Sequence, residues 1–344
     1  MNQTKLARQA YYDQIAPLHL TPLWENLSNL VATEPQAQSV PAIWHYENIR
    51  SLIMDAGELI TAKEAVRRVL ILENPGLEGQ SKITNTLYAG LQLILPGEVA
   101  PAHRHTQTAL RFIVEGSGAY TAVEGQKTIM CPGDFVTTPS WTWHDHGNET
   151  DQPMVWLDGL DIPIVNFFNA SFAEDLDEDS QTLSQPTGDN LARFGTGLLP
   201  LGYENTTPAS PVFNYPYERT REALEQLREA QDWDPCHGIK MRYVNPTTGG
   251  HALPTMATFM QLLPNGINTA PYRSTDSVVY SVVEGNGKTI AGGEKLFWGP
   301  KDTFIIPGWS SHCHMTDSDA VLFSFSDRPI QETVGIWRED RGNY

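Results

Sequence analysis

The sequence has few cysteines, no long apolar run and a shortage of basic residues. Its three cysteines are odd in number and form no CxxC pair, which excludes a disulfide framework and indicates reduced thiols. No apolar stretch approaches the roughly 18 residues of a membrane span, and residues 1–20 lack the apolar core of a secretory signal. Lysine and arginine number 23 against 41 acidic residues, a net charge of −18. We therefore expect a cytoplasmic protein without membrane or nucleic-acid partners.

What is present is a change of pattern along a chain long enough for two domains. Residues 1–83 carry apolar residues near helical spacing, including the run at 60–72, and predict a helical N-terminal segment. From about residue 84, short runs rich in β-branched and aromatic residues alternate with glycine and proline turns, which is typical of an antiparallel barrel or jelly roll. We expect one barrel at 84–170, an exposed acidic linker and a helix at 171–240, and a second barrel with a C-terminal tail at 241–344.

Two motifs recur in both β-rich blocks. Val-Glu-Gly-x-Gly begins at Val114 and again 169 positions later at Val283. Pro-x-Trp-x-x-His ends at His144 and again 168 positions later at His312. A nearly constant offset indicates a duplicated domain. The predicted fold is therefore mainly β, with two antiparallel jelly-roll β-barrels behind a helical N-terminal segment.

Three histidines of the first block are candidates for metal ligands. His103 and His105 are separated by one residue, so their side chains point to the same face of a strand. His144 follows a Gly-Asp turn and a proline, and could bring a third imidazole to the same point. Together these segments resemble the two sequence motifs of cupins. Three protein ligands leave open positions, which is typical of a catalytic metal, and imidazole suits Fe(II), zinc, copper or nickel.

Two neighbouring positions bear on this set. Ala109 stands where many cupins place a fourth, glutamate ligand, so the set has no carboxylate. Three neutral ligands would leave room for a bidentate anionic substrate and for dioxygen. His146 has the parity of His144 and could support a ligand or transfer a proton, although a histidine without any role explains it equally well.

The second block lacks such a set. Tyr272 and Ser274 occupy the positions that correspond to the first two histidines, and only His312 remains of the three. We expect the second barrel to hold no metal and to be structural.

Long segments carry a further resemblance. They are PAIWHYENIR (41–50), GELITAKEAVRRVLILENPGL (57–77), TLYAGLQLILPGEVAPAHRHTQTALRFIVEG (86–116), WTWHDHGNETDQPMVWLDGLDIP (141–163), MRYVNPTTGG (241–250) and YRSTDS (272–277). Through them the chain resembles the gentisate 1,2-dioxygenase family. The resemblance implies a cytosolic bicupin, usually a homotetramer, that uses Fe(II) and dioxygen in aromatic catabolism. It would cleave gentisate (2,5-dihydroxybenzoate) between C1 and C2 to give maleylpyruvate.

Other activities remain open at this stage. Salicylate and 1-hydroxy-2-naphthoate dioxygenases are related and are the first alternatives. A bicupin that binds without catalysis is a remote alternative, because the three histidines of the first barrel are intact.

An anionic substrate in so acidic a protein needs a local cation. Arg111 follows His105 by six residues, so it faces the same side of a regular strand. Its guanidinium could bind a carboxylate through charge-assisted hydrogen bonds, or it could instead pair with Asp158 or Glu115. The resemblance assigns substrate contact to Arg111 and also to Arg67, for which a solvated helix face is the alternative.

The resemblance also implies a pocket wall and the remaining site residues. Tyr88, Gly90 and Gln92 share one face of a strand. Tyr88 could hydrogen-bond the 5-hydroxyl of gentisate, since relatives that favour salicylate carry tryptophan there. Gly90 could leave room for the ring or simply allow close packing, and Gln92 could orient a ligand or dioxygen. Asp158 could hold a histidine or a substrate hydroxyl, although a hydrogen-bonded turn aspartate is an alternative. The predicted catalytic residues are thus Arg111, Arg67, His146 and Asp158.

Overall fold

The computed structural model describes residues 3–230 and 232–342. Residues 1–36 and residues 37–344 form two separate compact units. The first unit contains helices α1 (Gln3–Ile15) and α2 (Leu23–Leu30) and the 3-10 helix η1 (Ala16–Leu18). No residue of these three helices is buried. The described part of this unit therefore has no hydrophobic core of its own.

The first barrel is made of two antiparallel sheets. Their strand orders are β12-β8-β5-β10-β3-β2 and β11-β4-β9-β6-β7. The strands are β2 (Val69–Ile71), β3 (Tyr88–Ile94), β4 (Val99–His105), β5 (Ala109–Glu115), β6 (Tyr120–Val123), β7 (Gln126–Ile129), β8 (Phe135–Thr138), β9 (His144–Gly147), β10 (Met154–Leu160), β11 (Ala173–Asp175) and β12 (Asn214–Tyr215). The first predicted β-rich block thus folds as a β-barrel.

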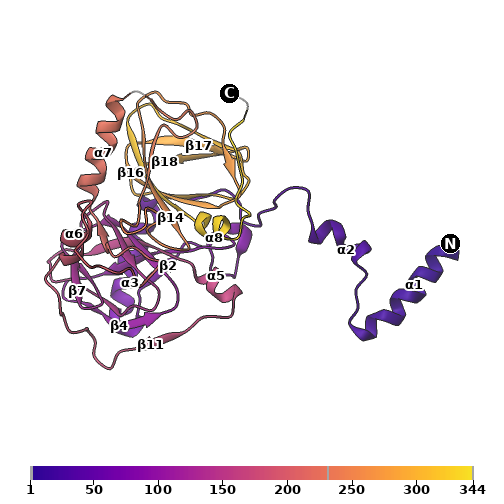
Figure 1. The fold of residues 1–344 in the computed structure, drawn as a ribbon, viewed down its shortest axis with the longest axis horizontal. Coiled ribbons are helices and arrows are strands. Elements are labelled where there is room, and N and C mark those ends of the chain that lie inside the picture. Colours follow the sequence, from indigo (N-terminus) through magenta and orange to yellow (C-terminus); the bar gives the residue numbers. More distant parts are fainter. Residues whose placement is uncertain (1–2, 231, 343–344) are drawn as a thin grey trace. The chain divides into compact units, whose positions relative to one another are not determined.

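The second barrel repeats this plan, and Figure 1 shows it in orange and yellow beside the purple strands of the first. Its sheets have the orders β1-β19-β16-β21-β14-β13 and β18-β17-β20, with a separate pair β15-β22. The strands are β1 (Ala42–Trp44), β13 (Ile239–Arg242), β14 (Ala257–Leu263), β15 (Arg273–Ser274), β16 (Val278–Glu284), β17 (Gly287–Ala291), β18 (Glu294–Trp298), β19 (Thr303–Ile306), β20 (His312–Met315), β21 (Ala320–Ser326) and β22 (Glu339–Asp340). The prediction of a mainly β fold with two barrels is confirmed.

Short helices connect and flank the barrels. They are α3 (Tyr46–Leu59), α4 (Ala62–Ala65), η2 (Pro75–Leu77), α5 (Ile162–Phe167), α6 (Asp189–Phe194), α7 (Tyr217–Glu229) and α8 (Arg328–Thr333). Within the described residues, none of the helices combines the length and the apolar character needed to cross a bilayer.

The run at 60–72, predicted to be helical, forms a strand instead. Only the four-residue α4 forms there, and the chain leaves it at Val66 with a φ of 58°. It then enters β2, which pairs with the edge of β3. Val69 and Ile71 are β-branched and fit a sheet edge better than a helix. A second strand in the predicted helical segment, β1, pairs with β19 of the second barrel.

The acidic stretch after residue 171, predicted to be an exposed linker, is partly bonded to the first barrel. β11 pairs with β4, so that Asp175 lies opposite His103. Leu176 and Asp179 extend this contact through backbone hydrogen bonds with Ala102, at 3.0 and 2.9 Å. The side chains of β11 are exposed, and its backbone closes one edge of the barrel sheet.

One hydrophobic core joins the two barrels. Phe112 of β5 stacks on Phe323 of β21 with ring centroids 4.1 Å apart and ring planes 5° apart. Gly159 of β10 makes room for Phe325, because a Cβ there would lie 2.8 Å from that ring. Side chains alternate along β5, so Arg111 points away from this core into its own barrel. The interface between the barrels thereby fixes which residues face the interior of the first.

Candidate active site

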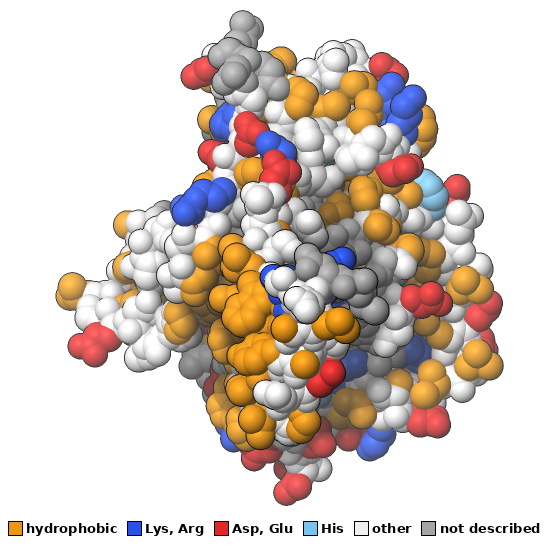
Figure 2. Space-filling view, turned by 90° about the vertical axis from the view of Figure 1, so that its right-hand side faces the viewer, with side chains coloured by type: hydrophobic (Ala, Val, Ile, Leu, Met, Phe, Trp, Pro, Cys, Tyr) orange, Lys and Arg blue, Asp and Glu red, His pale blue; other side chains and the backbone are white. Residues whose placement is uncertain are grey.

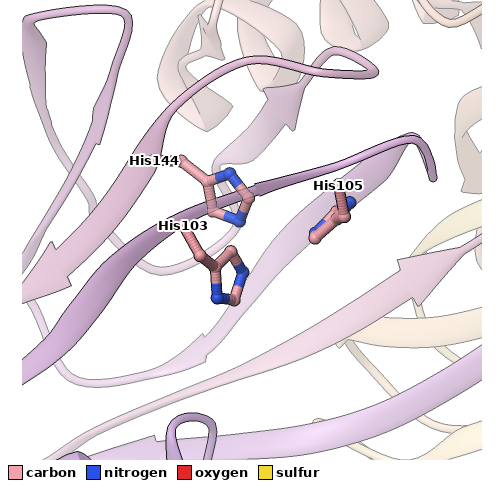
Figure 3. Close-up of side chains that lie close together, drawn as sticks. All are labelled: His103, His105 and His144. Carbon is pink, nitrogen blue, oxygen red and sulfur yellow. The ribbon is translucent and has the colours of Figure 1, made fainter. Parts of the chain in front are cut away.

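The three predicted ligands come together inside the first barrel (Figure 3). His103 and His105 project from the same face of β4, and His144 begins β9, directly opposite His103. One ring nitrogen of each lies within 4.8 Å of the others. Arg104, between the two β4 ligands, points the other way, and its guanidinium lies 4.6 Å from the rings of both Trp141 and Trp143. Strand alternation therefore separates a ligand face from an outer face, as the spacing predicts.

Backbone carbonyls fix which nitrogen of two rings faces the centre. Nδ1 of His105 donates to the carbonyl of Gln107 at 2.9 Å, and Nδ1 of His144 donates to that of Thr142 at 3.0 Å. A carbonyl only accepts, so each Nδ1 carries the proton and each Nε2 presents a lone pair. Nε2 of His144 is buried and has no partner among the described residues. A metal ion is the group that such a converging set of lone pairs fits.

Burial and nearby cations keep these imidazoles neutral. Burial, together with the nearby cations Arg67 and Arg111, lowers the pKa of His103 to about 2 and that of His105 to about 4. The pKa of His144 is also lowered, first by burial and then by the same two guanidinium groups. A metal ligand must be unprotonated, so the site is ready to bind a cation at neutral pH.

Arg111 and Asp158 lie side by side on the facing sheet. Arg111 donates from Nη1 to Oγ1 of Thr138 at 2.5 Å, while its Nε lies 3.8 Å from Oδ1 of Asp158. That oxygen accepts a hydrogen bond from Nε1 of Trp156 at 3.0 Å. Nε of Arg111 is buried without a hydrogen-bond partner. The guanidinium therefore keeps hydrogen-bonding capacity although an acid is near.

Burial shifts the pKa of both Asp158 and Arg111. Burial raises the pKa of Asp158 to about 6, against the effect of Arg111, which lowers it. Burial lowers the pKa of Arg111 to about 10, so it remains a cation at neutral pH. An incompletely paired buried cation beside the three histidines is suited to an anionic ligand.

Arg67 is buried at the same site and does not lie on a solvated helix face. It follows the sharp turn at Val66, and its Nη1 donates to the carbonyls of Val66 and Pro101 at 2.8 and 3.0 Å. Its Nη2 is buried without a partner, and burial lowers its pKa to about 9. The neighbouring Arg68 is instead paired with Glu98. Each of these two arginines has one buried donor without a partner, Nη2 in Arg67 and Nε in Arg68, but only Arg68 is neutralised by an ion pair among the described residues.

The predicted pocket-wall residues lie in register with this pair. Gly90, Asp158 and Arg111 form one row across β3, β10 and β5. Tyr88 lies on the same face of β3, and burial, followed by Asp158, raises the pKa of its hydroxyl. Gln92 is buried two residues further along β3. These positions agree with a pocket wall, and their contact with substrate stays a prediction.

The missing side chain at Gly90 leaves space that the side chain of Val69 fills. A Cβ there would lie 2.4 Å from Cγ1 of Val69 and 3.2 Å from the hydroxyl of Tyr88. We expect Gly90→Ala to destabilise the protein by about 1–3 kcal/mol through overpacking, lowering the thermal midpoint. Val69→Ala should restore more than half of this loss in the double variant, because the two sites couple directly. An equal loss with and without Val69→Ala would contradict this origin.

His146 occupies a place that both barrels share. Its Nδ1 lies 2.9 Å from Oγ1 of Thr121, and in the second barrel Nδ1 of His314 lies 2.8 Å from Oγ1 of Thr289. Both histidines are buried, and Nε2 of each lacks a described partner. Because the pair recurs in a barrel without the ligand set, a structural role explains it well. A catalytic role for His146 stays a prediction.

Sequence reasoning missed two contributors to the site. Thr138 anchors Arg111, and the backbone of β11 lies beside the ligand strand. Neither leaves a local signal, because one is an ordinary strand threonine and the other is an exposed acidic tripeptide.

Comparison with known proteins agrees with this geometry. Residues 90–160 match the model of the cupin domain. The chain is 55% identical to a gentisate 1,2-dioxygenase 1 from Aquipseudomonas alcaligenes over 97% of this chain and 96% of that protein. The chain belongs to the gentisate 1,2-dioxygenase family. Its relatives are ring-cleaving dioxygenases, so the predicted family and enzyme class are confirmed.

Other family members widen the picture. A 5-aminosalicylate 1,2-dioxygenase from Comamonas sp is 38% identical over 96% of this chain and 89% of that protein. The fold is similar to the crystal structure of salicylate 1,2-dioxygenase from Pseudoaminobacter salicylatoxidans with gentisate. That match has a TM-score of 0.92 at 36% identity, covering 98% of this chain and 94% of the other. The bicupin fold is thus confirmed.

Proposed function

We propose that this protein cleaves the ring of gentisate between C1 and C2 with one molecule of dioxygen, giving maleylpyruvate. The observation that carries the proposal is the set of three neutral imidazoles facing a buried, incompletely paired guanidinium, Arg111. The 55% identity to a gentisate 1,2-dioxygenase supports this choice of substrate. Both oxygen atoms are retained in the product, so no external reductant is needed.

The metal we propose is Fe(II), held by His103, His105 and His144. Divalent iron is compatible with imidazole ligands and, when bound, supplies the redox and Lewis-acid chemistry that ring cleavage by dioxygen requires. The unpartnered Nε2 of His144 supports a bound cation at this place.

The remaining residues bind and orient the substrate. Arg111 and Arg67 each have a buried donor without a partner, and together they would hold the substrate carboxylate. Asp158, whose pKa is raised, can accept a hydrogen bond or a proton from a ring hydroxyl. Holding the ring in one orientation beside the metal ligands supplies proximity.

Tyr88 is the proposed contact of the 5-hydroxyl. We expect Tyr88→Phe to lower kcat/KM for gentisate by about 5- to 10-fold, the loss of one hydrogen bond. Salicylate has no 5-hydroxyl, so its turnover should change less than about twofold, and initial-rate assays on both acids measure the difference. An equal loss of kcat/KM for gentisate and for salicylate would show that Tyr88 does not contact the 5-hydroxyl.

Salicylate is the second candidate substrate, because relatives at 36% and 38% identity are named for salicylate and 5-aminosalicylate. The test is to purify the protein anaerobically with ferrous iron and to add each acid in air-saturated buffer. We expect gentisate to be preferred, with one dioxygen consumed for each ring opened. Iron-loaded protein that consumes no oxygen with gentisate would overturn the proposal.

We also propose a homotetramer in the cytoplasm. Residues 1–36 expose several large apolar side chains, among them Leu20, Trp24 and Leu30, at 57, 63 and 69%. Hydrophobic side chains also gather in one area of the face seen in Figure 2. Subunit contacts would bury such surfaces. Light scattering of the purified protein gives the mass that tests this.

A further inference from the structure

The second barrel retains a cavity where the first has its metal ligands. The cavity has a volume of about 180 Å³, and its lining includes Tyr272, Ser274 and His312. These three occupy the positions of the first barrel's histidines. Nδ1 of His312 bonds the carbonyl of Ser310 at 3.2 Å, so its Nε2 takes the orientation that ligates in the first barrel. The second barrel thus has a cavity at the corresponding place, but two of the three histidines are replaced by tyrosine and serine.

This cavity is not built for a divalent metal. The hydroxyl of Tyr272 donates to Glu339 at 3.0 Å, so it is engaged elsewhere. Within residues 3–230 and 232–342, the first barrel's three histidines are the group of His, Cys, Asp and Glu side chains placed to hold an ion. The second cavity therefore needs another kind of occupant.

A lysine supplies the charge of this cavity. Lys240 of β13 lines it, and its Nζ lies 4.9 Å from the centre of the Phe259 ring and 5.6 Å from that of Tyr280. No described carboxylate lies within ion-pair distance of this Nζ. Tyr280 stands 169 positions after Arg111, so the cation of this barrel comes from a different strand.

Other charges in the lining leave a positive excess. Arg242 donates to the carbonyl of Gly249, and Arg328 pairs with Glu332. The lining contains one acid, Asp276, which accepts a hydrogen bond from Nε1 of Trp337 at 2.9 Å. Burial lowers the pKa of Lys240 to about 8, while Asp276 opposes this shift. Lys240 is half-buried and no described carboxylate contacts its ammonium directly, so a bound anion would offset the cost of its partial desolvation.

Size and walls restrict the anion. Phe259, Val278 and Tyr280 give the cavity apolar and aromatic walls. An apolar cavity of about 150 Å³ holds one benzene molecule, so a volume of about 180 Å³ suits a single six-membered ring with a small substituent. We propose that the second barrel is a non-catalytic binding site for a monocyclic aromatic carboxylate, held by Lys240 with its ring against Phe259 and Tyr280. This class includes the proposed substrate, but the site does not depend on ring cleavage.

Calorimetric titration with benzoate tests the proposal, using the full-length, metal-loaded protein without oxygen. Benzoate lacks the hydroxyl next to the carboxylate that the proposed ring cleavage requires, and Arg111→Met should weaken its binding in the first barrel. In Arg111→Met we expect one benzoate site per chain to remain. Adding Lys240→Met should weaken that site at least tenfold. The matched change Lys295→Met, at an exposed lysine of β18, should leave it unaltered.

Two further probes separate the parts of the site. Benzamide has the shape of benzoate without its charge and should bind at least tenfold more weakly, and inorganic phosphate, which has no ring, should also bind at least tenfold more weakly. If benzamide bound as tightly as benzoate, the site would not recognise the carboxylate. If phosphate bound as tightly as benzoate, the site would not recognise the aromatic ring. Loss of all benzoate binding in Arg111→Met would place it in the first barrel and overturn the proposal.

Stability of the variants is controlled separately. Lys240→Met removes a half-buried charge that makes no direct ion pair, so its thermal midpoint should not fall. Ser274→Leu fills the cavity from β15 and should abolish the same binding without touching Lys240. Wild-type affinity for benzoate in whichever of the two variants is folded would overturn the site.

Discussion

His144→Ala is expected to remove both the bound metal and ring cleavage, lowering kcat by at least about 10³-fold. The Nε2 atom of His144 is buried and makes no hydrogen bond within the described residues. Replacing the side chain with alanine therefore breaks no hydrogen bond of Nε2 that holds the fold together. Two remaining imidazoles would hold a divalent ion too weakly for turnover. Metal analysis after gel filtration and oxygen uptake with gentisate measure the two losses.

The control for this experiment is a histidine outside the site. His251 bonds Glu332 at 2.8 Å near the surface of the second barrel. His251→Ala should keep a full complement of metal and activity within about twofold. A His144→Ala protein that retained one metal ion per chain would show that the three imidazoles are not the ligand set.

Arg111→Met should lower kcat/KM for gentisate by about 10²- to 10³-fold, mainly through KM. The loss corresponds to removing one partner of a buried charged interaction, about 3–4 kcal/mol. Methionine fills the space of the aliphatic stem but offers no donor to the substrate carboxylate. Steady-state kinetics with gentisate measure the effect, and circular dichroism checks that the variant is folded.

Arg104 of β4, in the opposite sheet of the same barrel, offers a matched change. Its guanidinium lies between Trp141 and Trp143 on the outer face of β4 and pairs with Glu174. Arg104→Met should therefore change kcat/KM by less than about fivefold. Similar losses in both variants would mean that general charge near the site matters, and that Arg111 has no specific contact with substrate.

Local periodicity predicted the parts of the site that lie within single strands. The one-residue spacing of His103 and His105 places both side chains on one inner face of β4, because strand side chains alternate. Arg111 lies on β5 in the other sheet of the barrel, so its even spacing from His105 does not explain why it also points inward. The recurring Pro-x-Trp-x-x-His motif predicted a second copy of the barrel. Trp141 and Trp309 confirm it in detail, since both have a left-handed φ, 61° and 63°.

Contacts between distant segments could not be predicted in this way. Arg67 lies in a run of residues with helical spacing. Part of that run forms the strand β2 because it pairs with the edge of β3. Nothing near Gly90 in sequence shows that Val69 fills the space above it. Likewise Asp175 reaches His103 only through the pairing of β11. Each depends on tertiary structure, which overrides weak local preference.

The stacked Phe112 and Phe323 have a consequence for how the molecule can change over time. Because their shared core belongs to both halves, neither half buries its apolar surface alone, and heat should melt them in one concerted transition. A shortened chain that kept only the half with the three histidines would expose Phe112 and its neighbours and should aggregate. The barrel without the three histidines would therefore act as the folding partner of the barrel that carries them.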